Sequence, residues 1–258
     1  MVATRVAGVE RSLRRGRAPT ATWGFAHVVL VACCMAAILF LSAVAWPPRR
    51  DDSDLAATLA RTALALGGGA LVIAATALRT SPDRWRALGL EWRGSLRGAI
   101  GGWVAYAAMV PGMIGLALVA RWVLERIGVE FETQLVVRKF LAMPEAEVPI
   151  VIVLGVFVMP FLEELTFRAF LQPVLVRRAG PVLGIALTSS GFAALHGASA
   201  FLPIFGLSFV LGAVMQSTGR LLASWAVHAL HNGLVFGVLV FLRHHPELIG
   251  HSALLALR

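Results

Sequence analysis

The chain has 258 residues, of which 58% are hydrophobic and 14% charged, and its mean hydropathy is +0.79. This composition excludes an ordinary soluble domain and indicates a polytopic membrane protein. The formal charge of +9 comes almost wholly from arginine, since Lys139 is the only lysine. Because the arginines flank apolar stretches, we interpret the charge as a signal for topology and lipid head groups and not for nucleic-acid binding.

Seven apolar stretches are long enough to be interpreted as transmembrane helices. They lie at about residues 25–46, 62–78, 98–120, 148–176, 181–196, 202–217 and 221–242. The predicted fold is therefore an all-α, polytopic transmembrane bundle of about seven helices. We divide it into a basic tail (1–23), three N-terminal helices with their loops (24–147), a core (148–242) and a C-terminal tail (243–258).

The segments around these stretches carry weaker signals. Residues 1–23 lack apolar periodicity, which predicts a disordered cytoplasmic tail. The first stretch contains a cleavage-like Ala-Val-Ala, but its length and the later spans predict an uncleaved anchor. Arginines and two tryptophans in residues 79–97 predict an interfacial segment, and residues 121–147 are predicted to be the longest loop. The pairs Gly98/Gly102 and Gly233/Gly237 predict close helix packing.

Two adjacent glutamates, Glu163 and Glu164, interrupt the fourth apolar stretch. A carboxylate at the bilayer centre costs at least about 2.5–3.5 kcal/mol, so an intramembrane acidic pair indicates a functional site. Glu164 and Arg168 are four residues apart on one helix face and should form an internal ion pair. That pairing leaves Glu163, about 100° around the helix, as the free carboxylate and candidate base. Pro160 is expected to kink this helix and to free backbone groups.

Three further polar residues lie in or beside later apolar stretches. His196 follows Phe192 by four residues, and His228 lies one helical turn before Asn232. Each of them alone fits ordinary hydrogen bonding between helices. Together with a free carboxylate, they supply the base, acid and oxyanion stabiliser of a hydrolytic site. Straight, parallel helices would hold His196 and His228 at different depths, so we expect tilt, a kink or shifted helix ends.

The motifs E-E-x-x-x-R (163–168), F-x-x-x-H (192–196) and H-x-x-x-N (228–232) occur in this order in separate apolar stretches. This arrangement resembles the CPBP family, the CAAX-protease and bacteriocin-processing intramembrane proteases that include the Ras-converting CAAX endopeptidase. The resemblance covers about residues 149–232, with Ala169 where many members have glycine. It implies an intramembrane endopeptidase that hydrolyses a peptide bond of a membrane-associated protein or peptide.

The resemblance also implies a role for each matching residue. Glu163 and His196 would activate the hydrolytic water, and His228 and Asn232 would stabilise the oxyanion. Glu164 and Arg168 would organise the site. Members of the family are described both as metalloproteases and as metal-free glutamate proteases.

A zinc-dependent version would use Glu163, His196 and His228 as metal ligands. The nearby carboxylate left as a base would then be Glu164, which is expected to pair with Arg168. We therefore favour a mechanism without metal or another cofactor, and keep Zn²⁺ as the alternative.

Two other classes of protein fit part of the pattern. A transporter or proton relay also carries Glu, His and Arg within its spans, but polar residues spread over many spans would be expected, and the first three spans here hold almost none. A catalytically silent immunity or scaffold protein is the second alternative. The expected partners are a peptide or protein substrate in the membrane and the lipid bilayer. Arginine- and alanine-rich usage favours a bacterial cytoplasmic membrane, and the arginine distribution favours a cytoplasmic N-terminus.

Overall fold

The computed structural model describes residues 22–46, 55–128 and 135–248, and the regular elements in these ranges are all helices. This confirms the predicted all-α class. Six of the described helical segments are long and apolar enough to cross a membrane, and α9 is a shorter apolar helix. The chain is an integral membrane protein. Its principal helices are α2 (Phe25–Ala45), α3 (Leu55–Thr80), α4 (Ser95–Arg126), α5 (Leu135–Ala142), α9 (Pro181–Ala194), α10 (Phe201–Thr218) and α11 (Leu221–His244).

The fourth membrane segment, Glu145–Ala179, is a continuous rod in which α-helical and π-helical parts alternate. Its parts are η2 (Glu145–Glu147), α6 (Val148–Val153), the π-helix η3 (Leu154–Val158), α7 (Met159–Glu164), the π-helix η4 (Leu165–Leu171) and α8 (Gln172–Ala179). A π-helix pairs residue i with residue i+5, and such turns are frequent at functional sites. The two π-helices lie on either side of α7, which carries the adjacent glutamates.

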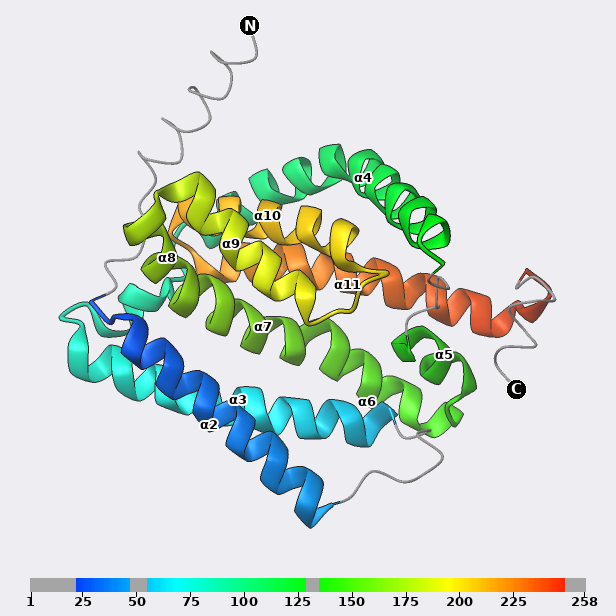
Figure 1. The fold of residues 1–258 in the computed structure, drawn as a ribbon, viewed down its shortest axis with the longest axis horizontal. Helices are drawn as coiled ribbons and strands as arrows, with labels where there is room; N and C mark the ends of the chain where they lie inside the picture. Colours follow the sequence, from blue (N-terminus) through cyan, green and yellow to red (C-terminus); the bar gives the residue numbers. More distant parts are fainter. Residues whose placement is uncertain (1–21, 47–54, 129–134, 249–258) are drawn as a thin grey trace, which may run out of the picture.

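The rod Glu145–Ala179 runs through the middle of the bundle (Figure 1). Helices α2 and α3 lie along one side of it, and α9, α10 and α11 lie along the other. Helix α4 is outermost and packs on α10 and α11. The middle of the rod is therefore surrounded by protein, which is the environment in which a membrane segment tolerates charged side chains.

Glycines set the contact between α4 and α11. A Cβ added at Gly102 would lie 2.5 Å from Val227, and one at Gly98 would lie 3.0 Å from Ala223. The predicted close packing is thus confirmed for this pair. It was wrong for the second pair, because a Cβ at Gly233 would come no nearer than 3.7 Å to Val156 and one at Gly237 would meet nothing within 4 Å. The spacing of small residues does not specify which helix face meets a neighbour.

The arginine-rich segment after α3 is attached to the turn between α10 and α11. It contains the short helix η1 (Arg84–Leu88), followed by Gly89, whose φ of 71° favours glycine. A Cβ at Gly89 would lie 2.9 Å from the carbonyl oxygen of Gly219, and the Leu221 amide donates to the Gly89 carbonyl at 3.0 Å. Trp92 in this segment is 81% exposed, as expected for an aromatic anchor.

Several element ends differ from the sequence-based bounds. Trp23, predicted to lie in a disordered tail, is fully buried and stacks on Phe170 with ring centroids 5.1 Å apart. Much of the predicted loop 121–147 is helical, because α4 continues to Arg126 and α5 follows. Helix α11 continues to His244, two residues into the predicted C-terminal tail. Residues 1–21, 129–134 and 249–258 lie outside the described residues, and with them most of both predicted tails.

Candidate active site

Glu164 lies at the end of α7 and has no exposed surface. Its Oε2 accepts a hydrogen bond from Ser224 Oγ at 2.5 Å and lies 3.5 Å from Arg168 Nε. Its Oε1 lies 3.0 Å from His228 Nδ1. The predicted ion pair with Arg168 is present, but Glu164 also holds two partners from α11. It therefore fixes that helix as well as its own.

Arg168 is also fully buried and joins the glutamate to two other helices. Its Nη2 donates to Ser208 Oγ of α10 at 2.9 Å. Its guanidinium carbon lies 4.4 Å from the ring centroid of Phe192 on α9. An arginine suits this position because its planar group can stack on a ring while its edge donates hydrogen bonds. Glu164 and Arg168 together connect the rod to α9, α10 and α11.

His228 lies between the two carboxylates. Its Nδ1 faces Glu164 Oε1 at 3.0 Å, and its Nε2 faces Glu163 Oε2 at 3.7 Å. Because an ionised carboxylate only accepts hydrogen bonds, Nδ1 carries the proton in the contact with Glu164. The side chain of Glu163 retains 19% exposure, whereas that of Glu164 has none. Glu163 is therefore the more accessible of the two glutamates, but it is not the free carboxylate that the helical spacing predicted, because His228 faces it.

His196 follows the end of α9 and reaches the site beside Phe192. Its Nδ1 lies 2.9 Å from the Phe192 carbonyl oxygen, which can only accept, so Nδ1 carries the proton and Nε2 has a free lone pair. The Phe192 ring lies 4.6 Å from the His196 ring and 5.8 Å from the His228 ring, between centroids. Straight, parallel helices would have held the two histidines at different depths, but both rings lie beside Phe192.

Asn232 lies one turn after His228 and contacts the π-helix η3. Its Nδ2 donates to the Gly155 carbonyl at 2.8 Å. In a π-helical turn the donor for that carbonyl would be the amide of residue 160, which is a proline and has no N–H. Asn232 supplies the missing donor. The neighbouring His231 faces away from the glutamates, and its Nδ1 lies 2.9 Å from the hydroxyl of Tyr106 on α4.

Residues 145–234 match the family described as Rce1-like, type II CAAX prenyl endopeptidase. This segment is similar to that family, and it covers about a third of the chain. No curated protein and no solved structure matches the chain. The matched segment contains Glu163, Glu164, Arg168, His196, His228 and Asn232, and it begins after α2, α3, α4 and α5.

The arrangement of possible metal ligands bears on the zinc alternative. Within the described residues, no three His, Cys, Asp or Glu side chains are grouped so that they could hold a metal ion. Both histidines have their Nδ1 engaged, one by Glu164 and one by a backbone carbonyl. As placed, Glu163, His196 and His228 do not form the zinc ligand set of the alternative mechanism.

Two serines contribute to the site without having been predicted. Ser224 lies one turn before His228 on the same helix face, a spacing that could have indicated it. Ser208 carries no such signal, because a serine in an apolar stretch is more often a small packing residue. Both are fully buried, and their hydroxyls contact Glu164 and Arg168 respectively.

Proposed function

We propose that the chain is an intramembrane endopeptidase in which Glu163 is the base that activates water. The observation that carries the proposal is the position of His228 between Glu163 and a second, fully buried carboxylate. Side chains of Ser224 and His228 contact the oxygens of Glu164, while Glu163 remains accessible. A hydrolytic base needs such an accessible carboxylate held in a fixed position.

Glu163 and His196 are suited to hold one water molecule between them. Both Glu163 and the free Nε2 of His196 accept hydrogen bonds, and a water molecule has two hydrogens to donate. A water bound in this way directs its oxygen lone pair at the substrate carbonyl. Glu163 takes one proton as the water oxygen bonds to the carbonyl carbon. The carbon–nitrogen bond then breaks, and Glu163 returns that proton to the leaving amine.

His228 and Asn232 are proposed to stabilise the oxyanion formed on the carbonyl oxygen. His228 donates from Nε2 only when both ring nitrogens carry protons, and the charge of that imidazolium is balanced by two flanking glutamates. Asn232 has two N–H groups on Nδ2, of which one binds the Gly155 carbonyl. The second remains for an oxyanion, while the first keeps the side chain in place. One such donor contributes about 10²–10³-fold to the rate.

The proposed substrate is a protein or peptide held at the membrane, since Glu163, His228 and Asn232 lie on helical segments long and apolar enough to cross a membrane. The related family is described as acting on CAAX prenyl proteins. We propose the broader substrate class for this chain, with a prenylated CAAX peptide as the first substrate to be tested.

The test is hydrolysis of peptides by the purified protein in nanodiscs, with the products read by mass spectrometry. We expect Glu163→Gln to lower the rate by about 10²–10⁴-fold without a change in thermal stability. The matched control is Glu125→Gln, an exposed residue of α4 that pairs with Arg121 away from the site. Equal activity of the Glu163→Gln protein and the control would overturn the proposed role of Glu163, and no cleavage of any membrane-anchored peptide would overturn the proposed function.

A further inference from the structure

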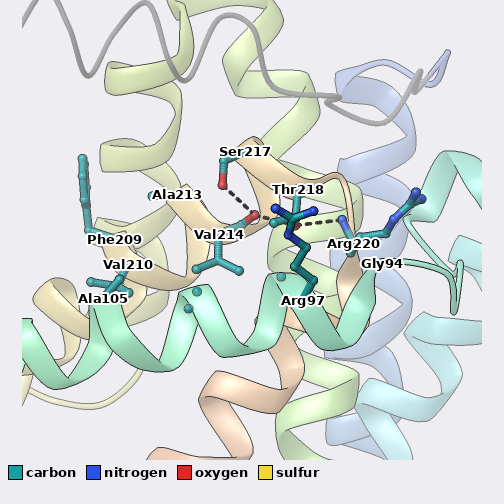
Figure 2. A pocket seen from close by; sticks show the side chains of 13 residues that line it. Gly94, Arg97, Ala105, Phe209, Val210, Ala213, Val214, Ser217, Thr218 and Arg220 are labelled. Atoms are coloured by element: carbon teal, nitrogen blue, oxygen red, sulfur yellow. Dashed lines mark hydrogen bonds between the residues drawn. The ribbon is translucent and has the colours of Figure 1, made fainter.

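A groove of about 930 Å³ lies between α4 and α10, outside the active site (Figure 2). Small residues of both helices line it, among them Gly101, Ala105 and Ala213. Helix α10 contacts the active site with one face and lines the groove with another. Ser208 of α10 contacts Arg168, whereas its neighbours Phe209 and Val210 line the groove.

Glycines explain why the groove is open. Gly98 and Gly102 bring α4 close to α11 on one side, as described above. Gly101 faces the groove, and a Cβ added there would meet nothing within 4 Å. The flanking α4 residues Leu96, Ile100 and Val104 are 69%, 51% and 67% exposed. In a membrane-spanning helix this face meets lipid, so the groove opens toward the acyl chains.

One end of the groove is basic and the other is apolar. Figure 2 shows Arg97 and Arg220 at one end, and Ala105, Phe209 and Val210 at the other. Arg220 is ion-paired with Glu91. Arg97 is exposed, and in the part of the chain that the structure describes no ion pair involves it. The basic end therefore keeps a net positive charge.

The length of the groove matches one leaflet of a bilayer. From Gly94 to Ala105, α4 rises about 16 Å at 1.5 Å per residue. Half of a hydrocarbon core of about 30 Å is about 15 Å. The basic end follows the exposed Trp92, which is typical of a residue at the membrane interface. The groove thus runs from the interface toward the middle of the membrane.

We propose that this groove binds an anionic phospholipid, with its phosphate at Arg97 and Arg220 and an acyl chain along Gly101 and Ala105. Basic sites between membrane helices at the level of the head groups bind anionic lipids. The apolar length of the groove requires an acyl chain, which free phosphate lacks. A zwitterionic lipid offers the same chain but brings its own positive charge to the arginines. This site does not depend on the proposed proteolytic function.

The test is native mass spectrometry of the purified protein titrated with phosphatidylglycerol, phosphatidylcholine or water-soluble glycerol phosphate. The groove variants are Arg97→Gln and Gly101→Leu. Their matched controls are Arg93→Gln, an exposed arginine that does not line the groove, and Gly115→Leu, where an added Cβ on the same helix also meets nothing within 4 Å. Thermal unfolding without added lipid confirms that each variant is folded.

We expect the unaltered protein to bind phosphatidylglycerol more tightly than phosphatidylcholine, and glycerol phosphate not at all. Arg97→Gln should weaken phosphatidylglycerol binding about five-fold, and Gly101→Leu should weaken the binding of both lipids. The proposal is overturned if each groove variant behaves like its control, if glycerol phosphate binds as well as the lipid, or if both lipids bind equally. A change of oligomeric mass in Gly101→Leu with unaltered lipid binding would instead identify an interface between copies of the chain.

Discussion

Glu163 and Glu164 are adjacent in the chain, yet their surroundings differ because successive helical side chains point about 100° apart. Glu164 is directed into the protein, where Arg168, Ser224 and His228 contact it. Glu163 is directed at the accessible side of His228. A single turn of helix thus holds one fully buried carboxylate that contacts Arg168 and α11 and one that keeps part of its surface accessible.

The first prediction concerns the fully buried pair of Glu164 and Arg168. Glu164→Gln or Arg168→Met alone should cost about 3–5 kcal/mol of stability, because each leaves a buried charge without its partner. The double variant should cost less than the sum of the two, since no unpaired charge remains. Thermal unfolding of the three variants in detergent measures this. Strictly additive losses would show that the two charges do not stabilise each other.

The second prediction concerns metal dependence. If a metal ion took Glu163, His196 and His228, the remaining carboxylate would be Glu164, whose oxygens are already engaged. We therefore expect the protein to hydrolyse its peptide at an unchanged rate after exhaustive chelation. Zinc content is measured alongside. Stoichiometric zinc, with activity lost on its removal and restored on its return, would contradict the metal-free mechanism and leave the proposed proteolysis standing.

At the scale of the elements, hydropathy predicted where helices lie but not how they are built. The stretch 148–176 was recognised as one span because its apolar side chains are continuous. Its two π-helices were not predicted, since side chains from distant parts of the chain donate to carbonyls of these turns. Trp225 Nε1 donates to the Phe157 carbonyl at 3.0 Å, and Trp23 Nε1 donates to the Phe170 carbonyl at 2.9 Å. These contacts join residues far apart in the chain, so the local sequence pattern does not predict them.

The motif residues of the site could be predicted from the sequence alone. Charged and imidazole side chains are rare in apolar stretches, so Glu163, Arg168 and His228 stood out. Ser208 did not stand out, although it contacts Arg168. The bounds of α3 were too short in the prediction, because its first turns, from Leu55, are less apolar than its middle.

The third prediction concerns the carbonyls of the π-helices. Trp23→Phe removes the donor to the Phe170 carbonyl in η4 and should cost about 1–3 kcal/mol of stability, the penalty for a buried unsatisfied group. The matched control is Trp103→Phe, which removes a donor to the Ala226 carbonyl within the regular helix α11. That carbonyl lies in an ordinary α-helix and its donor is 36% exposed, whereas Trp23 is fully buried, so the control should cost less on both grounds. Equal losses in thermal unfolding would contradict this account of the π-helix.

For the whole molecule, contacts between helix ends define two ends of the bundle. At the first end, Thr22 Oγ1 donates to the Thr80 carbonyl, Arg177 binds the Trp23 carbonyl, and Leu221 binds Gly89. The starts of α2, α9 and α11 therefore lie with the ends of α3, α8 and α10. At the second end, Arg61 binds the Trp46 carbonyl and Arg243 pairs with Glu145.

These contacts fix at which end of the bundle α2 begins and α11 finishes, whether or not the short α9 crosses the whole membrane. Helix α9 begins at the first end, and α10 ends there. Helix α2 therefore begins at the first end of the bundle, and α11 finishes at the second. The first end also carries the arginines of residues 79–97 together with Arg177, Arg178 and Arg220. The positive-inside rule therefore favours a cytoplasmic first end.

The last prediction is that the two termini lie on opposite sides of the membrane, with the amino terminus in the cytoplasm. Cys33 and Cys34 are first replaced by alanine, because they would react with the label. A cysteine added after Arg258 should then react with a membrane-impermeant maleimide in intact spheroplasts, whereas one added before Met1 should react only after lysis. Labelling of the amino-terminal cysteine alone would show the reverse orientation. The same result for both termini would contradict the arrangement of helix ends, because α2 begins at the first end of the bundle and α11 finishes at the second.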